Sequence, residues 1–359
     1  SDDNFPLVLK SLNNIPTSGA LYDELYELQN LVSTVVNASN AALQIIEIYA
    51  DSNTASAPVT PSGIAPTKST FEDAGVEGVT DNNLVSINDA LATSAVISSR
   101  VNRTTKVQSL VDAYNAVFKL ADGIKGNADP SQALRFDQLE LIGVDTSAIK
   151  SAINPSVRLE LLNNLMDAQS AEGVDRVYEI DRLIKIVNAI QDQSIGVTPA
   201  YTLAPNDFTV IGITGVTSTN LAGLMSRIEA TTNDGVQANT QAKLQQLFND
   251  SLSLNFESVS TDTGISSTDA ITNDNTLTFS GTSTAKDGSV VKLTMTSNFG
   301  AIISFTTTVT SGTWQAVYPS AFTDGVYQVN TQLLDSGLNV IRSAPLKSVT
   351  IDTAATLLP

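Results

Sequence analysis

The hydrophobic pattern of this chain changes its period once, near residue 250, and that change limits the folds open to it. Before this point apolar residues recur at the spacing of amphipathic helices, in stripes over 21–35, 107–118 and 177–190. After it, short alternating or β-branched segments follow one another with a turn about every ten residues. We therefore predict a multidomain protein in which an all-α region of short helices precedes an all-β region.

The β region has the sequence pattern of a sandwich. Turn-forming pairs such as Asp287-Gly288 and Ser311-Gly312 separate its apolar segments. The predicted strands cover 277–279, 290–296, 303–310, 313–318 and 326–334. Short strands at this spacing are typical of a β-sandwich, and we place the single tryptophan of the chain, Trp314, in its core.

The helical region contains an internal similarity, which predicts helical repeats. A phenylalanine followed seven residues later by glycine and valine occurs at Phe71, Phe136 and Phe208, and a degenerate copy begins at Phe5. We expect each glycine to form a left-handed turn, and the polar residue after it to cap the next helix. The predicted boundaries are 1–65 for a degenerate N-terminal unit, 66–130, 131–200 and 201–252 for the repeats, and 255–355 for the sandwich.

Two local patterns add detail to the helical region. Thr105 and Gln108 have the spacing of a capping box, so we expect them to begin the helix that carries the 107–118 stripe. The stretch 51–69 is rich in Ser, Thr, Ala and Pro, which predicts an extended loop between helical units.

The composition excludes several classes of function. The chain has 19 basic and 37 acidic residues, a net charge of -18, so we expect no binding to nucleic acid or to anionic lipid. No apolar run approaches the roughly 20 residues of a membrane span, and we predict no membrane insertion. Histidine and cysteine are both absent, which excludes catalytic triads, thiolate zinc sites and disulfides.

The remaining catalytic options are weak. A Ser-x-x-Lys pattern occurs at Ser147–Lys150, on a predicted helix whose counterparts lack it, and we expect no nucleophile there. The other carboxylates are scattered, so a glycosidase is only a distant alternative. We therefore predict that the protein is not an enzyme.

Acidic residues of the β region form a candidate metal site. Asp262, Asp269 and Asp274 lie in a polar segment before the first strong strand, and Asp352 follows the last one. We expect these two segments at opposite poles of the sandwich, where clustered carboxylates need a cation. Oxygen ligands of this kind suit calcium. Alternatively, these residues are solvated turn formers, as Asp287, Asp324 and Asp335 are expected to be.

Several segments of the β region occur in an order that resembles a known family. They are Asp262-Thr263-Gly264, Ile271-Thr272-Asn273-Asp274, Leu277-Thr278-Phe279, Gly312-Thr313-Trp314, Phe322-Thr323-Asp324-Gly325 and Val349-Thr350-Ile351-Asp352-Thr353. Together they resemble the immunoglobulin-like repeats of very large bacterial surface adhesins and biofilm-associated proteins. The helical units resemble, more loosely, all-helical repeats beside such modules in giant secreted bacterial proteins.

This resemblance implies a rod of tandem modules on the bacterial cell surface. It also implies calcium at the module junctions, with Asp262, Asp269 and Asp274 matching the acidic segment of the family and Asp352 matching the residue before the next module. The chain departs from the family at Asp335–Asn339, where many copies read Asp-x-Ala-Gly-Asn, and this departure weakens a calcium site there.

Sequence and resemblance together predict a non-catalytic, extracellular segment of a bacterial adhesin or biofilm matrix protein. Its expected partners are neighbouring modules, other copies of the chain, or a cell-surface glycan or protein. One alternative is a self-assembling surface-layer or filament subunit. A second is a helical module that binds a glycan or peptide, with Tyr22 and Tyr26 one helical turn apart.

Overall fold

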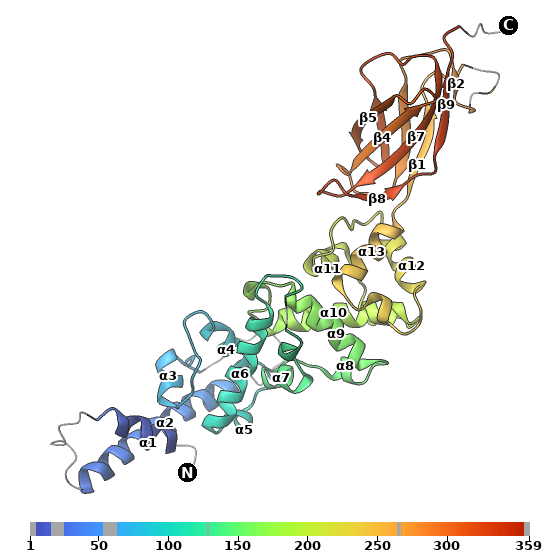
Figure 1. The fold of residues 1–359 in the computed structure, drawn as a ribbon. Helices are drawn as coiled ribbons and strands as arrows, with labels where there is room; N and C mark the ends of the chain where they lie inside the picture. The colour runs from blue at the N-terminus through green and yellow to red at the C-terminus, as the bar shows by residue number, and fades with distance from the viewer. Residues whose placement is uncertain are drawn as a thin grey trace. The chain divides into compact units, whose positions relative to one another are not determined.

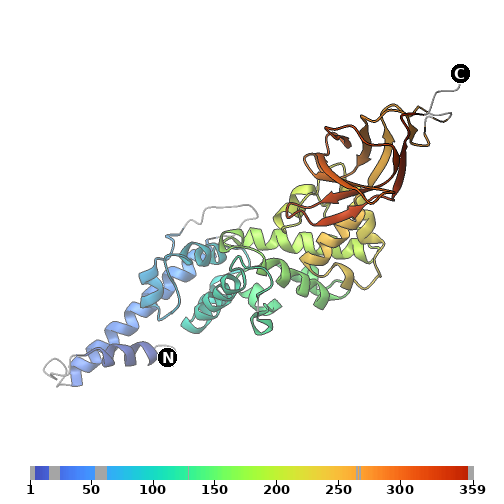
Figure 2. The same cartoon turned by 45° about the horizontal axis from the view of Figure 1, so that its top comes forward.

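The computed structural model describes residues 5–15, 25–52, 63–127, 129–263, 266 and 268–354 (Figures 1 and 2). The chain divides into two compact units, Ser1–Ala189 and Ile190–Pro359. A helical N-terminal region is followed by a C-terminal β-sandwich, so the predicted order of the two fold classes is confirmed.

The first unit is built from helices. They are α1 (Phe5–Asn13), α2 (Leu25–Asp51), α3 (Lys68–Asp73), α4 (Leu84–Leu91), α5 (Ser98–Val101), α6 (Thr104–Leu120), α7 (Phe136–Leu141), α8 (Ser147–Lys150), α9 (Pro155–Asp167) and α10 (Val177–Ser194), which ends in the second unit, with short 3-10 turns η2 (Pro130–Gln132) and η3 (Ala171–Gly173). The stripes that predicted α6 and α10 are buried, because Val107, Leu110, Tyr114, Ile180 and Leu183 all lie in the core.

The second unit contains three more α-helices and the sandwich. The helical elements are α11 (Pro205–Val210), α12 (Leu221–Glu229), η4 (Val236–Ala238) and α13 (Gln241–Ser251). The strands are β1 (Leu254–Val259), β2 (Ile271–Thr272), β3 (Thr278–Ser283), β4 (Val290–Ser297), β5 (Ile302–Thr308), β6 (Thr313–Val317), β7 (Gly325–Leu334), β8 (Val340–Ser343) and β9 (Lys347–Ile351).

The strands form two sheets around an aromatic core. One sheet has the order β1-β3-β6, and the other has the order β2-β9-β7-β4-β5, with β8 paired to β7 (Figure 1). Trp314 is buried between the sheets, as predicted, and lies near Phe256. The five strands that the alternation predicted correspond to β3 through β7, whereas β1, β2, β8 and β9 were not predicted.

Strand β1 decides where the acidic segment of the sandwich lies. It carries the chain from the helical side to the opposite pole before residues 261–274 begin. There β2 pairs in parallel with the end of β9, and the Asp352 N–H donates to the Thr272 carbonyl at 2.9 Å. The acidic segment and Asp352 therefore share one pole, and the expectation of opposite poles is wrong because it left out β1.

Helix α2 is the longest helix described, with 27 residues. By length and composition alone it is apolar enough to cross a membrane, a test that core helices of other proteins also pass. By these two criteria, the expectation that no apolar segment is long enough for a membrane span does not hold for α2. One face of the C-terminal half of α2 is buried, with Leu43, Ile46 and Tyr49 in the core.

Helices α3, α7 and α11 end in the same way. Each is followed by a glycine in the left-handed region, at Gly75, Gly143 and Gly212. The N–H of the residue after the glycine then donates to the carbonyl of the fourth of the six helical residues: Val76 to Phe71 at 2.8 Å, Val144 to Leu139 at 3.1 Å and Ile213 to Phe208 at 2.8 Å. These bonds satisfy carbonyls that the end of a helix leaves unpaired.

The buried anchor of α7 is therefore Leu139 rather than Phe136. Phe71, Leu139 and Phe208 are fully buried, and each lies four residues before its glycine. Phe136 is the first residue of α7 and is only half-buried. Phe5 is exposed at the start of α1. The sequence comparison matched Phe136 to Phe71 and Phe208 by residue type, whereas the buried residue of α7 that corresponds to them is Leu139.

Glutamine side chains hold the turns that follow α3 and α11, each through a pair of hydrogen bonds to one backbone residue. We call each such pair of bonds a clamp. The Gln108 side chain accepts from the Glu77 N–H at 2.8 Å and donates to the Glu77 carbonyl at 3.1 Å. Gln245 makes the same pair of bonds to Thr214, at 2.9 and 3.3 Å. Since Gln108 is committed to Glu77 and α6 begins after Arg103, the predicted Thr105–Gln108 capping box is wrong.

At the corresponding place after α7, an aspartate replaces the glutamine. Asp181 Oδ1 accepts from the Asp145 N–H at 3.4 Å, and a carboxylate has no proton to donate to the carbonyl. Burial raises the pKa of Asp181 above its ordinary value. The folded state thus disfavours the ionised form of this side chain at neutral pH.

We expect Asp181→Gln to stabilise the protein by about 1 kcal/mol at neutral pH, because it restores a second hydrogen bond and removes a partly buried charge. A raised pKa in the folded state means that the wild type regains stability as the pH falls from neutral toward about 4, so the advantage of the variant should shrink over that interval. Thermal unfolding at both pH values measures this. Asp145→Asn is the control of opposite sign, since bonds from Ser147 lower the pKa of Asp145.

Candidate functional site

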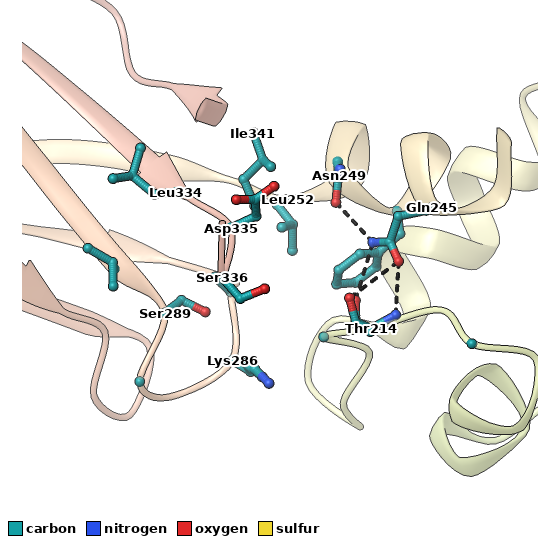
Figure 3. Close-up of a pocket in the computed structure, with 16 residues that line it drawn as sticks. Thr214, Gln245, Asn249, Leu252, Lys286, Ser289, Leu334, Asp335, Ser336 and Ile341 are labelled. Carbon is teal, nitrogen blue, oxygen red and sulfur yellow. Dashed lines mark hydrogen bonds between the residues drawn. The ribbon is translucent and has the colours of Figure 1, made fainter. Parts of the chain in front are cut away.

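A pocket of about 540 Å³ lies between helix α13 and the sandwich, inside the second compact unit (Figure 3). We call it the joint pocket. Its lining combines apolar, amide and hydroxyl side chains with one lysine and one aspartate. The labelled residues are Thr214, Gln245, Asn249, Leu252, Lys286, Ser289, Leu334, Asp335, Ser336 and Ile341, and Phe248 also lines it.

Helix α13 and the turn after α11 form one wall of the joint pocket. Gln245 fixes this wall through its two bonds to Thr214, and its amide also donates to Asn249 Oδ1 at 3.1 Å. Gly215 has a positive φ of 93°, and a Cβ there would lie 3.0 Å from the Phe248 ring. Glycine is therefore required for the turn to pack closely on α13.

The opposite wall consists of turns between strands of the sandwich. Asp335 accepts hydrogen bonds from the backbone N–H groups of Gly337 and Asn339, both at 2.8 Å, and these bonds with the Asn339 side chain lower its pKa. Among the described residues, Lys286 Nζ and Ser336 Oγ have no hydrogen-bond partner, and both side chains project toward the gap in Figure 3. These groups suit hydroxyl or carboxylate groups of a polar ligand.

Beside the pocket, a strap of hydrogen bonds joins the helices to the sandwich. The Ser253 N–H donates to Thr284 Oγ1 at 2.8 Å, and the Thr284 N–H donates to the Ser253 carbonyl at 3.3 Å. The Asn220 amide donates to the Thr284 carbonyl at 3.2 Å and to the Gly215 carbonyl at 3.1 Å. Only Leu252 and Ser253 separate α13 from β1, so the joint has no flexible spacer.

Three of the four predicted metal ligands each serve a local turn. Asp269, Asp274 and Asp352 accept N–H groups two residues ahead, from Ile271, Thr276 and Ala354. Asp262 Oδ2 accepts from the Ala270 N–H at 2.9 Å, while its Oδ1 is buried without a hydrogen-bond partner in the structure as described. The part of the chain that is described holds no group of three or more acidic side chains able to share a metal ion. Calcium binding stays a prediction.

The other acidic turn residues also have local partners. Asp287 Oδ1 accepts from the Ser311 N–H at 2.8 Å. Asp324 accepts from the backbone N–H and the hydroxyl of Thr353, both at 3.0 Å, and so holds the chain where it leaves β9. These contacts fit the alternative interpretation of these aspartates as turn formers.

Ser147 and Lys150 lie together on helix α8, but the lysine is engaged elsewhere. Lys150 Nζ binds Glu140 Oε1 at 2.9 Å, and Thr146 donates to the same oxygen at 2.5 Å. These bonds lower the pKa of Glu140, and they hold the Lys150 side chain against that carboxylate. Of the two tyrosines singled out from the sequence, Tyr26 is exposed on α2 and Tyr22 lies outside the described residues.

Comparison with known protein families identifies the sandwich. Residues 252–353 match a family model described as a bacterial Ig-like domain. This match covers β1 through β9 and agrees with the resemblance drawn from the sequence. The chain thus contains a domain of a kind compatible with surface proteins. A search of curated proteins found no match to the chain.

Proposed function

We propose that this chain is a non-catalytic, structural segment of an extracellular bacterial surface protein, in which the Ig-like domain transmits tension. One observation carries the proposal: the Ig-like domain receives the chain from α13 at one pole and releases it after β9 at the other. A domain with its ends at opposite poles suits a place in a series of modules.

The strand pairing supports a load-bearing role. Tension between Leu254 and Ile351 acts along β1 and β9, which are held to β3 and β7 by antiparallel ladders. The hydrogen bonds of such ladders are perpendicular to the strands, so the load falls on many bonds at once. The strap from Asn220 and Ser253 to Thr284 couples the domain directly to the preceding helices.

In this proposal the helical region is a series of related structural units that precede the Ig-like domain. The left-handed glycines after α3, α7 and α11 and the clamps by Gln108, Asp181 and Gln245 support one helical unit used three times. Units of this kind extend a surface protein by addition of copies. In this proposal the partners are neighbouring modules, other copies of the chain, or a glycan or protein on a cell surface.

Single-molecule pulling of the full chain by its two ends tests the proposal. We expect the Ig-like domain to unfold last, at a higher force than the helices, and to release about 100 residues, or roughly 350 Å of chain. Gly281→Ala, argued below, should lower the force of that event alone and so identify it. Unfolding of the domain before the helices, or at the same force, would remove the load-bearing role.

A further inference from the structure

The joint pocket has no part in the structural role proposed above, yet it is a formed cavity. Its volume of about 540 Å³ lies in the range of small-molecule sites in proteins. Gln245 holds its helical wall through the two bonds to Thr214, and the strap beside it ties the same helices to the sandwich. A ligand that enters a cavity with hydrogen-bonded walls loses little free energy to ordering them.

Polar side chains that lack partners face this cavity from the sandwich side. Figure 3 shows Lys286, Ser289 and Ser336 pointing toward the gap, and within the described part of the chain the ammonium and both hydroxyls have no hydrogen-bond partner. On the helical side, Asn249 Oδ1 accepts from Gln245 at 3.1 Å, while the described residues offer no partner to the Asn249 amide nitrogen. All four groups donate hydrogen bonds, and the hydroxyls also accept them.

The rest of the lining is mainly apolar. Phe248 and Leu252 are each 3% exposed and Leu334 is 7% exposed. They line the pocket together with Val290 and Ile341. C–H groups of a ligand gain free energy when they leave water for such a surface. The pocket therefore suits a small molecule that combines C–H groups with hydroxyl groups.

The formal charge of the lining is zero, although the chain as a whole has a net charge of -18. Among the described residues that line the pocket, Lys286 is the one cation and Asp335 is the one carboxylate. Two further carboxylates flank the lining in sequence: Asp250 lies 3.8 Å from Arg227, and Asp287 accepts a backbone N–H. These carboxylates would repel an anion, and a cation would meet Lys286, so charge favours a neutral ligand.

We propose that the joint pocket binds a neutral saccharide of one or two rings. A saccharide ring carries C–H groups on its faces and hydroxyl groups around its rim, and each hydroxyl both donates and accepts hydrogen bonds. The C–H faces fit against Leu252 and Leu334, and the rim hydroxyls pair with the unpartnered groups of both walls. The proposal gives a class of glycan partner to the structural role above, but it stands on the pocket alone, so either can fail without the other.

Other ligands fit the lining less well. Phosphates and nucleotides are usually held by several cations or by the paired donors of arginine, and the lining has a single lysine. An extended peptide pairs its backbone with the free edge of a sheet, whereas the unpartnered groups of this pocket belong to side chains. An acidic sugar has the same shape as a neutral one, and charge alone separates the two.

Saturation-transfer difference NMR on the full chain tests the proposal. The panel contains neutral methyl glycosides and disaccharides of glucose, galactose, mannose and N-acetylglucosamine, and we expect at least one to bind with a Kd below about 5 mM. Lys286→Met keeps the apolar stem and removes the ammonium, so it should weaken binding about tenfold or more. Ser289→Phe with Ser336→Phe places two rings at the gap and should abolish binding.

Lys292→Met is the matched control, because Lys292 lies on β4 outside the joint pocket. It should leave the Kd within about twofold of the wild type. No binding of any panel member at about 20 mM, or binding that the two phenylalanines leave intact, overturns the proposal. Binding of a uronic acid or a dipeptide in place of the neutral saccharides, lost in the phenylalanine variant, would also overturn it and assign the pocket to that class. Circular dichroism and Trp314 fluorescence confirm that the variants fold.

Discussion

Gly281→Ala is expected to destabilise the Ig-like domain by about 3 kcal/mol, which lowers its melting temperature by roughly 15 °C. Gly281 lies in β3, opposite Phe256 of β1 and Trp314 of β6. A Cβ at this position would lie 2.0 Å from the Asn255 carbonyl oxygen and 2.5 Å from the Trp314 ring. The first neighbour is backbone, so the clash is relieved only if β1 moves away from β3 or the indole leaves its place in the core.

Trp314 makes this prediction easy to measure, because it is the single tryptophan of the chain and its fluorescence reports on the sandwich alone. Gly223→Ala is the control. Gly223 lies in α12, where a Cβ meets no atom closer than 3.6 Å, and alanine there should add about 0.5 to 1 kcal/mol to the stability of the helix. A fluorescence melt of Gly281→Ala within about 2 °C of the wild type would show that the sheet absorbs the methyl group and that the packing argument fails.

The sequence predicted the elements of this protein better than their contacts. The alternation of residue types located β4, β5 and β7 nearly to their ends, because alternate residues of each strand are more buried than their neighbours. Strand β1 was not predicted, since Leu254–Val259 alternates weakly and has a bulge between Phe256 and Ser258. Because β1 was left out, the sequence analysis placed the acidic segment at the wrong pole of the sandwich.

The helical turns show the same limit. Left-handed turns at the predicted glycines Gly78, Gly143 and Gly215 are confirmed, since few other residues adopt that conformation, but Gly75 and Gly212, which end α3 and α11, were not predicted. The clamps by Gln108 and Gln245 could not, because each joins residues 31 positions apart and glutamine is common on exposed helix faces. The choice of Leu139 over Phe136 likewise depends on which side chain points inward, and this requires the start of α7 to be known.

The joint pocket was also outside the reach of sequence analysis. The repeated pattern predicted a turn at Gly215. Asn220, which donates to the Gly215 carbonyl, reaches the sandwich through Thr284, and Thr284 follows β3 without a distinguishing pattern around it. A polar residue that contacts the next domain has the same sequence signature as one that contacts water.

Arg158 is buried, although arginine is usually a surface residue. Its replacement by methionine is expected to lower the free energy of unfolding by about 3 to 5 kcal/mol. It lies in α9 and is only 2% exposed, although arginine is among the residues least often buried. Its guanidinium donates to the Ile153 carbonyl at 3.1 Å and to the carbonyl and side-chain oxygens of Asn188 at 3.1 and 3.0 Å. Methionine fills a similar volume but leaves three acceptors without these donors.

Urea unfolding followed by circular dichroism at the helical band measures this cost. Arg135→Met is the matched control, since Arg135 is exposed and its ion pair with Asp137 at 3.0 Å should contribute less than about 1 kcal/mol. A loss in Arg158→Met no greater than in Arg135→Met would mean that α9 and α10 are held by apolar packing alone. The expected difference arises because the part-buried acceptors of Arg158 regain water only in part when the arginine is lost, whereas the partner of an exposed arginine regains it fully.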